Sequence, residues 1–193
     1  MTDIMSESAL DPSGLGLSPL PKAAIANGKA VDGENDDLVA WIELFYFAYR
    51  DFTCEPDAIL AQYGFGRAHH RVLHFVQRNP GLNVASLLDI LKITKQSLAR
   101  VLKQLVGEGF IIQRAGDVDR RERRLFVSAK GGRLTEKLTR IQVKRFEAAL
   151  AQAGPGAGVL TRRFLFAMIA EKDHAHVEAL LQGAAKNSGV PLE

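Results

Sequence analysis

Hydrophobic residues crowd one early stretch of the chain at every helical position. A helix is predicted to begin near Asn35 or Asp36, either of which suits an N-cap, and Glu43 is the only charged residue along its apolar part. Its apolar residues are Leu38, Trp41, Ile42, Leu44, Phe45, Tyr46, Phe47 and Tyr49. A helix that is apolar on nearly all sides is buried from more than one direction. In a chain of 193 residues we therefore expect a second subunit to cover part of it.

Three further helices are predicted in quick succession. One runs from about Phe65 to Arg78 and stops at the breaker Asn79-Pro80-Gly81. Asn83 suits the N-cap of a short helix, and Thr94 suits that of another, which ends at Gly107. Each short helix has one apolar face, formed by Val84, Leu87, Leu88 and Leu91 in the first and by Leu98, Val101, Leu102 and Leu105 in the second.

Only Lys92 and Ile93 separate these two short helices, so together they predict a helix-turn-helix. The β-branched segment 110–114 then predicts a strand. A glycine-containing turn over residues 115–119 and a basic run into residues 125–127 complete a β-hairpin with arginines at its tip. The order helix, helix-turn-helix and hairpin is that of a winged helix.

Two helices are predicted to follow the hairpin. Ser128 suits the N-cap of a long helix that reaches about Ala151 and is broken by Gly154-Pro155-Gly156. The last helix is predicted from about Val159 to Leu181, with a broad apolar face. The fold class is therefore mainly α with a small β-hairpin wing, a winged helix-turn-helix flanked by N- and C-terminal dimerisation helices.

The composition fits one globular domain with mobile ends, since 47% of residues are hydrophobic and 24% are charged. We predict a mobile tail over residues 1–35, a single DNA-binding and dimerisation domain over 36–185, and a C-terminal tail over 186–193. The acidic start lacks the apolar segment of a secretory signal, and the most apolar short run, Phe164 to Ala170, is far below the about 20 residues of a membrane span. With a single cysteine, the chain is expected to be cytoplasmic and unconnected with a membrane.

Charge is distributed unevenly, although the net charge is only +3. Residues 1–64 hold three Lys or Arg against eleven Asp or Glu, whereas residues 94–133 hold ten against four. A compact basic region suggests an acidic polymer as partner, and a solvated surface is the plainer alternative.

The polar face of the second short helix indicates that the acidic polymer is duplex DNA. The major groove admits one helix, and Gln and Arg side chains can each make two hydrogen bonds to a base edge. Arg100 or Lys103 alone would equally suit a solvated surface, but the tight turn and the wing favour DNA. The predicted contacts on this helix are Thr94, Lys95, Gln96, Ser97, Arg100 and Lys103, with Gln104 also facing outward.

Four segments carry a resemblance to a known family. They are G-R-A-H-H-R-V-L-H-F-V (Gly66 to Val76), L-L-D-I-L-K-I-T-K-Q-S-L-A-R-V-L-K-Q-L (Leu87 to Leu105), G-E-G-F-I (Gly107 to Ile111) and D-R-R-E-R-R-L-F-V-S-A-K-G (Asp119 to Gly131). Over about Asp36 to Leu181 the chain resembles the multiple-antibiotic-resistance regulator (MarR) family. The resemblance is most specific from the turn through the D-x-R wing, and the flanking helices match in pattern and length.

The resemblance implies a bacterial homodimer that binds an inverted-repeat operator, with one winged helix on each half-site. It implies that Asp119 holds Arg121 in an ion pair that shapes the wing and leaves Arg120 to enter the minor groove. Arg123 completes the predicted wing contacts. The family also implies a repressor that is released or rearranged by a small-molecule effector, with no cofactor. The sequence does not identify that effector, and the aromatic residues of the first helix suit either its crevice or subunit packing.

The histidines suggest a metal site, a hypothesis with weaker support than DNA binding. His70 and His74 are spaced i, i+4 on one helical face, but zinc needs three or four ligands and none is near in sequence. His69 falls on the apolar face, where a packed and hydrogen-bonded residue is expected. His174 and His176 are two residues apart and should point to different faces. We therefore predict no metal site.

Cys54 is a candidate redox sensor, because one branch of the family senses peroxides through a cysteine within its first helix. We place Cys54 after that helix, beside acidic residues that disfavour a thiolate, and expect an incidental thiol. Motifs of enzyme active sites are absent from the sequence. The alternative function is a winged helix that binds protein instead of DNA, and the polar recognition face argues against it.

Overall fold

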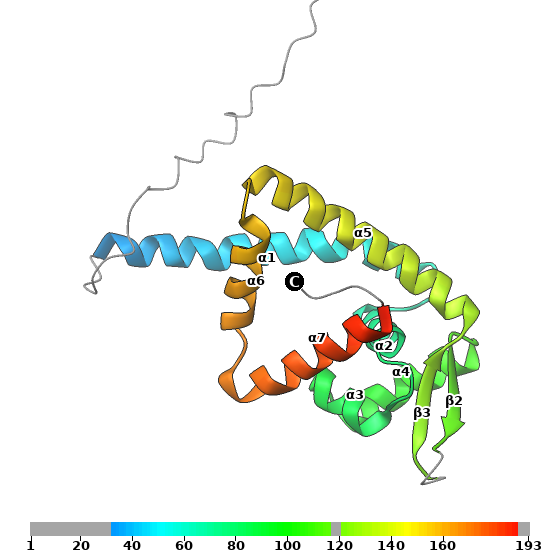
Figure 1. Ribbon diagram of the computed structural model, residues 1–193. Helices are drawn as coiled ribbons and strands as arrows, with labels where there is room; N and C mark the ends of the chain where they lie inside the picture. The colour runs from blue at the N-terminus through cyan, green and yellow to red at the C-terminus, as the bar shows by residue number, and fades with distance from the viewer. Residues whose placement is uncertain (1–31, 117–120, 189–193) are drawn as a thin grey trace, which may run out of the picture. The chain divides into compact units, whose positions relative to one another are not determined.

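The computed structural model describes residues 32–116 and 121–188 (Figure 1). Its elements are α1 (Asp32–Ala61), α2 (Arg67–Arg78), β1 (Leu82–Asn83), α3 (Val84–Leu91), α4 (Lys95–Gly107), β2 (Ile111–Ala115), β3 (Arg123–Val127), α5 (Ala129–Ala153), α6 (Ala157–Ala167), the 3₁₀ turn η1 (Glu171–Asp173) and α7 (His174–Ser188). The chain divides into two units, residues 1–43 and 44–193, and α1 runs through both.

Helix α1 begins earlier than predicted, at Asp32, and continues to Ala61. The prediction that Cys54 follows the first helix is therefore wrong: Cys54 lies inside α1, with its side chain exposed. The helix continues through Pro56, which is fully buried, as is Leu60 one turn later. Burial of these apolar side chains in the core offsets the backbone hydrogen bond that proline cannot donate.

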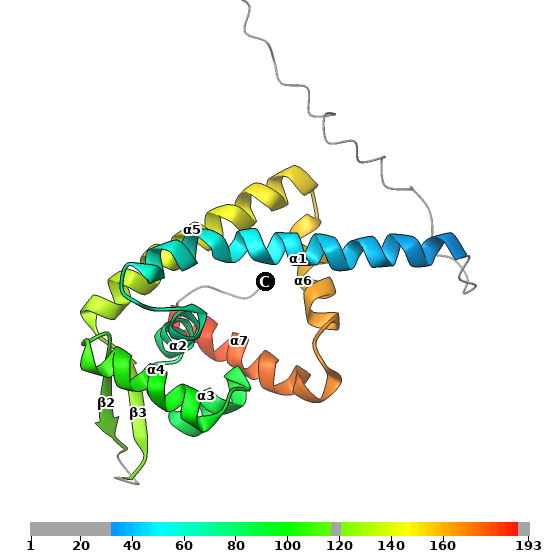
Figure 2. The same cartoon turned by 180° about the vertical axis from the view of Figure 1, so that it is seen from behind.

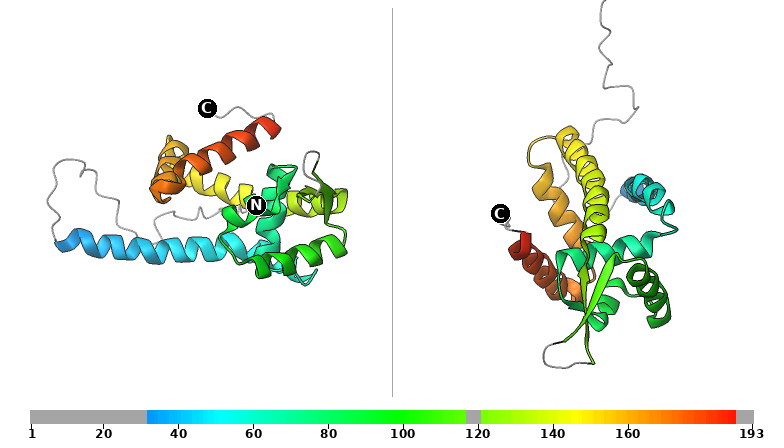
Figure 3. Two further views of the ribbon diagram at one scale, coloured as in Figure 1. Left: turned by 90° about the horizontal axis from the view of Figure 1, so that it is seen from below. Right: turned by 90° about the vertical axis from the view of Figure 1, so that its right-hand side faces the viewer.

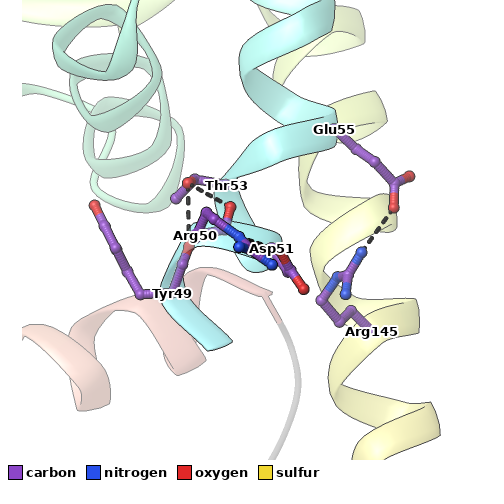
Figure 4. A network of polar contacts seen from close by, with 6 residues as sticks. All are labelled: Tyr49, Arg50, Asp51, Thr53, Glu55 and Arg145. Carbon is purple, nitrogen blue, oxygen red and sulfur yellow. Dashed lines mark hydrogen bonds and ion pairs between the residues drawn. The ribbon is translucent and has the colours of Figure 1, made fainter. Parts of the chain in front are cut away.

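The second part of α1 lies alongside α5, as the two opposite views show (Figures 1 and 2). Arg145 of α5 donates a 2.9 Å hydrogen bond to Glu55, and the rings of Phe52 and Phe146 meet edge to face with centroids 5.2 Å apart. Figure 4 shows the ion pair and, on the neighbouring turn, the buried Thr53 hydroxyl, which donates back to carbonyls of its own helix. These contacts join the N-terminal helix to the helix that follows the wing.

One apolar core underlies the helix-turn-helix and reaches α1 and α5. It is built from one face of each helix, as the helical spacing predicted. Its buried members are Leu60, Phe65, Val72, Leu73, Val76, Leu87, Leu98, Val101, Leu102, Leu105, Phe110, Ile111, Leu125, Leu134 and Leu138. The core fixes α4 by its apolar side, which leaves the opposite side of α4 free for other contacts.

The sheet has three antiparallel strands in the order β1-β3-β2, whereas the sequence predicted only the two of the hairpin. The missed strand, β1, is two residues long and pairs Leu82 with Leu125 and Asn83 with Arg124. So short a strand has no alternation of polar and apolar residues to recognise. It nevertheless joins the returning strand of the hairpin to the residue that precedes α3.

The predicted single C-terminal helix is wrong, because α6 ends at Ala167 and α7 starts at His174 after η1 (Figure 3). The His174 ring lies 2.8 Å from the carbonyl oxygen of Ile169 and stacks near Phe166, with centroids 4.6 Å apart. The ring nitrogen donates to a carbonyl that, in a continuous helix, would accept a hydrogen bond from a backbone amide of the next turn. This local bond, together with the extended backbone of Ala170, separates the two helices.

Two half-buried histidines of α2 should make the fold sensitive to acid. The pKa of His70 and the pKa of His74 lie below the ordinary value of 6.5, chiefly because burial disfavours the charged ring. Nearby Arg71 lowers the pKa of His70 further and Asp57 opposes it, while His70 and Arg78 lower that of His74.

Since the unfolded chain takes up protons below about pH 6.5 that the folded chain resists, the free energy of unfolding should fall as pH drops below that value. His74→Gln should reduce this slope by up to about 1.4 kcal/mol per pH unit. Urea denaturation at pH 7.5, 6.5 and 5.5 measures it, with His176→Gln as a surface control. An unchanged slope in the His74 variant would show that His74 is not a source of the acid sensitivity.

Within the described residues, every helix is too short or too polar to cross a lipid bilayer.

Candidate nucleic-acid interface

The helix-turn-helix forms as predicted, from α3, a short turn over residues 92–94 and α4. Lys92 ends α3 in the left-handed conformation, with φ of 50°, and its amide donates to the carbonyl of Leu88 at 2.9 Å. Its ammonium group pairs with Asp89 at 2.7 Å. Thr94 then caps α4 by accepting a hydrogen bond from the amide of Ser97 at 3.2 Å. Both capping predictions, at Asn83 and Thr94, are confirmed.

Helix α4 divides cleanly into a buried face and an exposed polar face. Its buried residues are Leu98, Val101, Leu102 and Leu105. The structure gathers the predicted contacts Lys95, Gln96, Ser97, Arg100 and Lys103 on the exposed part. Thr94 is also exposed, but its hydroxyl donates to Ser97 Oγ at 2.9 Å and serves the helix start. The exposed face is cationic and rich in hydrogen-bonding groups, as a helix that reads base edges requires.

Gln104 does not belong to this face, contrary to the prediction that it points outward. Its side-chain oxygen lies 2.9 Å from Nε2 of His69, and its amide nitrogen donates to Glu108 at 2.9 Å. His69 Nδ1 accepts from the Gly66 amide, so the protonated Nε2 is the donor to Gln104. The His69 ring also stacks on Phe65, with centroids 4.7 Å apart. The predicted packed and hydrogen-bonded His69 is confirmed, and through it α2 holds the end of α4.

An open groove of about 790 Å³ follows one flank of α4, between α3 and strand β2. Its lining is largely apolar, with Lys95 and Lys103 along α4 and Gln113 on the strand. Ala99, small and exposed, lies between the two lysines on the same flank. Small side chains here leave room for another molecule to approach both ammonium groups.

The hairpin confirms the predicted wing. Strands β2 and β3 pair antiparallel from Ile111 opposite Val127 to Ala115 opposite Arg123, and extend beyond α3 and α4 (Figures 1 and 2). Arg121 and Arg123 are exposed. Asp119 and Arg120 lie outside the described residues, so the ion pair between Asp119 and Arg121 stays a prediction.

The base of the wing is tied to the start of α5. Ser128 caps α5 by accepting from the Gly131 amide at 3.0 Å, as predicted, and its hydroxyl donates to the carbonyl of Gly109 at 2.7 Å. The amide of Ser128 donates to the carbonyl of Phe110 at 3.0 Å. Lys130 reaches back to the Glu108 carbonyl at 2.9 Å and covers the Phe110 ring. The end of the recognition helix, the wing and α5 therefore meet in one hydrogen-bonded junction.

Glu122 was not singled out by the sequence reasoning, and Asn83 was recognised only as the cap of α3. Glu122 precedes β3, and one of its carboxylate oxygens accepts a 2.6 Å hydrogen bond from the side chain of Asn83. Asn83 also caps α3, accepting from the Ser86 amide at 2.8 Å. The two residues are far apart in sequence, and only the run of arginines around Glu122 hinted that an acid there has a separate role.

The other candidate residues do not form a site. In the described part of the chain, no three His, Cys, Asp or Glu side chains gather as metal ligands would. His70 and His74 lie on α2, whereas His174 packs on Phe166 and His176 lies 3.6 Å from Asp89.

Comparisons with known proteins agree with this geometry. The sequence model of the MarR family matches residues 63–122. PetP, an HTH-type transcriptional regulator of Rhodobacter capsulatus, is 44% identical over 146 residues, which cover 76% of this chain and 88% of PetP.

Solved structures share the fold at low identity. The transcriptional regulator SlyA has a TM-score of 0.56 at 18% identity and covers 66% of this chain and 89% of its own. A SlyA-like regulator from Listeria monocytogenes has a TM-score of 0.53 at 16% identity, covering 86% and 99%. The apo form of MarR from E. coli has a TM-score of 0.50 at 17% identity, covering 64% and 91%.

Proposed function

The chain belongs to the MarR family of winged-helix, DNA-binding transcription regulators, and from this membership we propose that it is a cytoplasmic homodimeric repressor of an inverted-repeat operator. The observation that carries the proposal is the exposed polar face of α4 beside an arginine-bearing hairpin. The alternative, a protein-binding winged helix, requires an apolar recognition face. The large apolar residues of α4 are instead turned into the core.

We assign base reading to the first turns of α4. Gln96 and Ser97 lie at its N-terminal end, where a recognition helix meets base edges, and Arg100 is one turn further along the same face. Gln suits adenine and Arg suits guanine, each by two hydrogen bonds. Lys95 and Lys103 flank the open groove and are assigned to phosphates, where an ammonium acts as a point charge.

The wing is assigned to the minor groove. Arg121 and Arg123 are exposed on the hairpin, and Arg120 directly precedes Arg121 in the sequence. A narrow minor groove concentrates negative potential that attracts arginine, with little dependence on base identity. The wing arginines therefore contribute affinity, and α4 contributes sequence preference.

Dimerisation explains the exposed apolar residues at both ends of the chain. Tyr46 and Leu44 of α1 are 63% and 58% exposed, and Leu160 and Met168 of the α6 region are 64% and 57% exposed. Large apolar side chains exposed in such number mark an interaction site. A second copy of the chain that covers these residues gives the dimer two winged helices, each made of α3, α4 and the hairpin. We call each of them a reading head, one for each half of an inverted repeat. A small-molecule effector that alters the spacing of the two heads would release the operator.

The separate roles of helix and wing give a direct test. Sequences selected from a random duplex pool would supply the operator, and gel shifts on operator and scrambled duplex across a salt series would measure affinity. Gln96→Ala should weaken operator binding by about tenfold and leave scrambled DNA nearly unaffected. Arg123→Ala should weaken both duplexes and flatten the slope of log affinity against log salt by about one unit.

The reverse pattern, with Gln96→Ala equal on both duplexes and Arg123→Ala specific for the operator, would show that the assignment of element to groove is inverted. Lys137→Ala on α5, away from both elements, is the control and should change neither affinity by more than about twofold.

A further inference from the structure

Glu122 is an acidic residue in the most basic segment of the chain. Residues 120–124 contain four arginines and this one carboxylate. A negative charge on a surface that approaches DNA repels phosphates, so by itself it weakens binding. Glu122 is half-buried and held by defined contacts, whereas a solvated acid would be exposed. Its place in the wing therefore calls for a physical role.

Its contacts join three elements. One carboxylate oxygen accepts the 2.6 Å hydrogen bond from the side-chain nitrogen of Asn83, and the other lies 3.5 Å from Nε of Arg124 on β3. The backbone carbonyl of Glu122 accepts from the Gly116 amide at 3.0 Å, where the two arms of the hairpin separate. Glu122 therefore contacts both arms of the hairpin and, through Asn83, the start of the helix-turn-helix.

Asn83 carries this connection into α3. Its side-chain oxygen caps α3 at the amide of Ser86, while its side-chain nitrogen donates to Glu122. Its backbone pairs with Arg124 in the sheet. Both ends of the Asn83 amide are therefore used, one on the reading head and one on the wing. A hydrogen bond from an amide to a carboxylate is stronger than one between neutral groups.

We propose that Glu122 is a positioning residue that fixes the angle of the wing relative to the helix-turn-helix, and so places the wing arginines for DNA. The proposal rests on the proposed function, because its benefit is realised on a duplex. The loss from charge repulsion is outweighed by the gain from holding the hairpin in its bound direction. The carboxylate touches the reading head, and the arginines touch DNA.

The sign of one mutant effect distinguishes this role from simple electrostatics. If Glu122 acts only as a charge, Glu122→Ala should tighten DNA binding. If it positions the wing, Glu122→Ala should weaken binding by about tenfold, the loss expected for one charge-assisted hydrogen bond. Glu122→Gln retains an acceptor for the Asn83 amide and should fall between the alanine variant and the wild type. Glu147→Ala, which removes an exposed acid of α5, is the charge control and should change affinity by less than about twofold.

A double-mutant cycle tests the contact itself. Asn83→Ser keeps an oxygen to cap α3 but removes the longer side-chain amide whose nitrogen donates to Glu122. It should weaken binding about as much as Glu122→Ala, and the double variant should be no weaker than either single variant. Additive losses, or tighter binding by Glu122→Ala, would overturn the proposal.

A readout without DNA separates failure of this inference from failure of the proposed function. The Gly116 amide donates to the backbone carbonyl of Glu122, and the Ser86 amide donates to the side-chain oxygen of Asn83. Glu122→Ala keeps both acceptors but removes the carboxylate that links the hairpin to Asn83, so both bonds should open more often. Hydrogen exchange at the two amides should therefore accelerate while core amides of α4 keep their protection. If the wild type binds no duplex, the proposed function fails and exchange still decides whether Glu122 holds the wing. Unchanged exchange at both amides would refute the positioning role.

Discussion

Replacing Gly131 by alanine is expected to lower the free energy of unfolding by about 3 kcal/mol, the upper range for overpacking a closed site. A Cβ at Gly131 would collide with the carbonyl oxygen of Phe110 and come within 2.7 Å of Cγ1 of Val127. The carbonyl cannot retreat, because it already accepts the Ser128 amide at 3.0 Å. For a chain of this size the melting temperature should fall by roughly 6 to 12 °C.

Gly132 provides a matched control in the same turn of α5. A Cβ there meets only the side-chain oxygen of Gln77, at 3.8 Å, which is ordinary contact. Gly132→Ala should therefore leave stability unchanged or raise it by about 0.5 to 1 kcal/mol, because alanine loses less entropy in a helix. Thermal unfolding of both variants by circular dichroism measures the difference. Equal melting temperatures would show that the junction of Phe110, Val127 and α5 can relax.

The prediction on Gly131 also bears on DNA binding. Phe110 immediately precedes β2, and Val127 ends β3, so a displaced α5 shifts both strands of the wing at their base. At a temperature where Gly131→Ala is still folded, we expect weaker binding to every duplex. The loss of affinity should affect operator and scrambled DNA alike, as expected for Arg123→Ala, and not the operator alone, as expected for Gln96→Ala.

The features that could be predicted from sequence depend on neighbours in the chain. An N-cap bonds an amide three residues on, so Asn83, Thr94 and Ser128 were recognisable without knowing the fold. The apolar period of α4 likewise determined which of its residues face outward. The break at Ile169 was missed, although it is equally local, because a histidine that bonds a carbonyl has no strong sequence signature.

Contacts between distant residues could not be read from the sequence. Gln104 shares the polar pattern of α4, and only the folded chain brings His69, 35 positions away, to its side-chain oxygen. The bond between Asn83 and Glu122 spans 39 positions and depends on the pairing of β1 with β3. Cys54 was misplaced because the apolar pattern of the first helix was followed only to Tyr49, whereas burial of Leu60 favours continuation. Tertiary packing decided each of these cases.

Charged substitutions in the exposed apolar surface should abolish the dimer and reduce operator affinity by at least about 100-fold. Phe45 on α1 is 52% exposed in the single chain, and Leu160 on α6 is among its most exposed apolar residues. In a homodimer each substitution occurs twice, so Phe45→Glu or Leu160→Glu places two carboxylates against apolar surface. The monomer would keep a folded reading head, because neither side chain belongs to the core cluster.

Ala58→Glu introduces the same charge at an exposed position of α1 outside the aromatic stretch, and should leave the dimer intact. Sedimentation at micromolar concentration should give about twice the 21.1 kDa chain mass for the wild type and for this control, and the chain mass for the other two. A monomer binds through one reading head only, so it lacks the gain in affinity that a linked second head supplies, typically a factor of about 100 or more. Its affinity for a single half-site should match that of the wild type. A folded wild-type monomer at that concentration would refute the dimer, and a dissociated variant with full operator affinity would show that one head suffices.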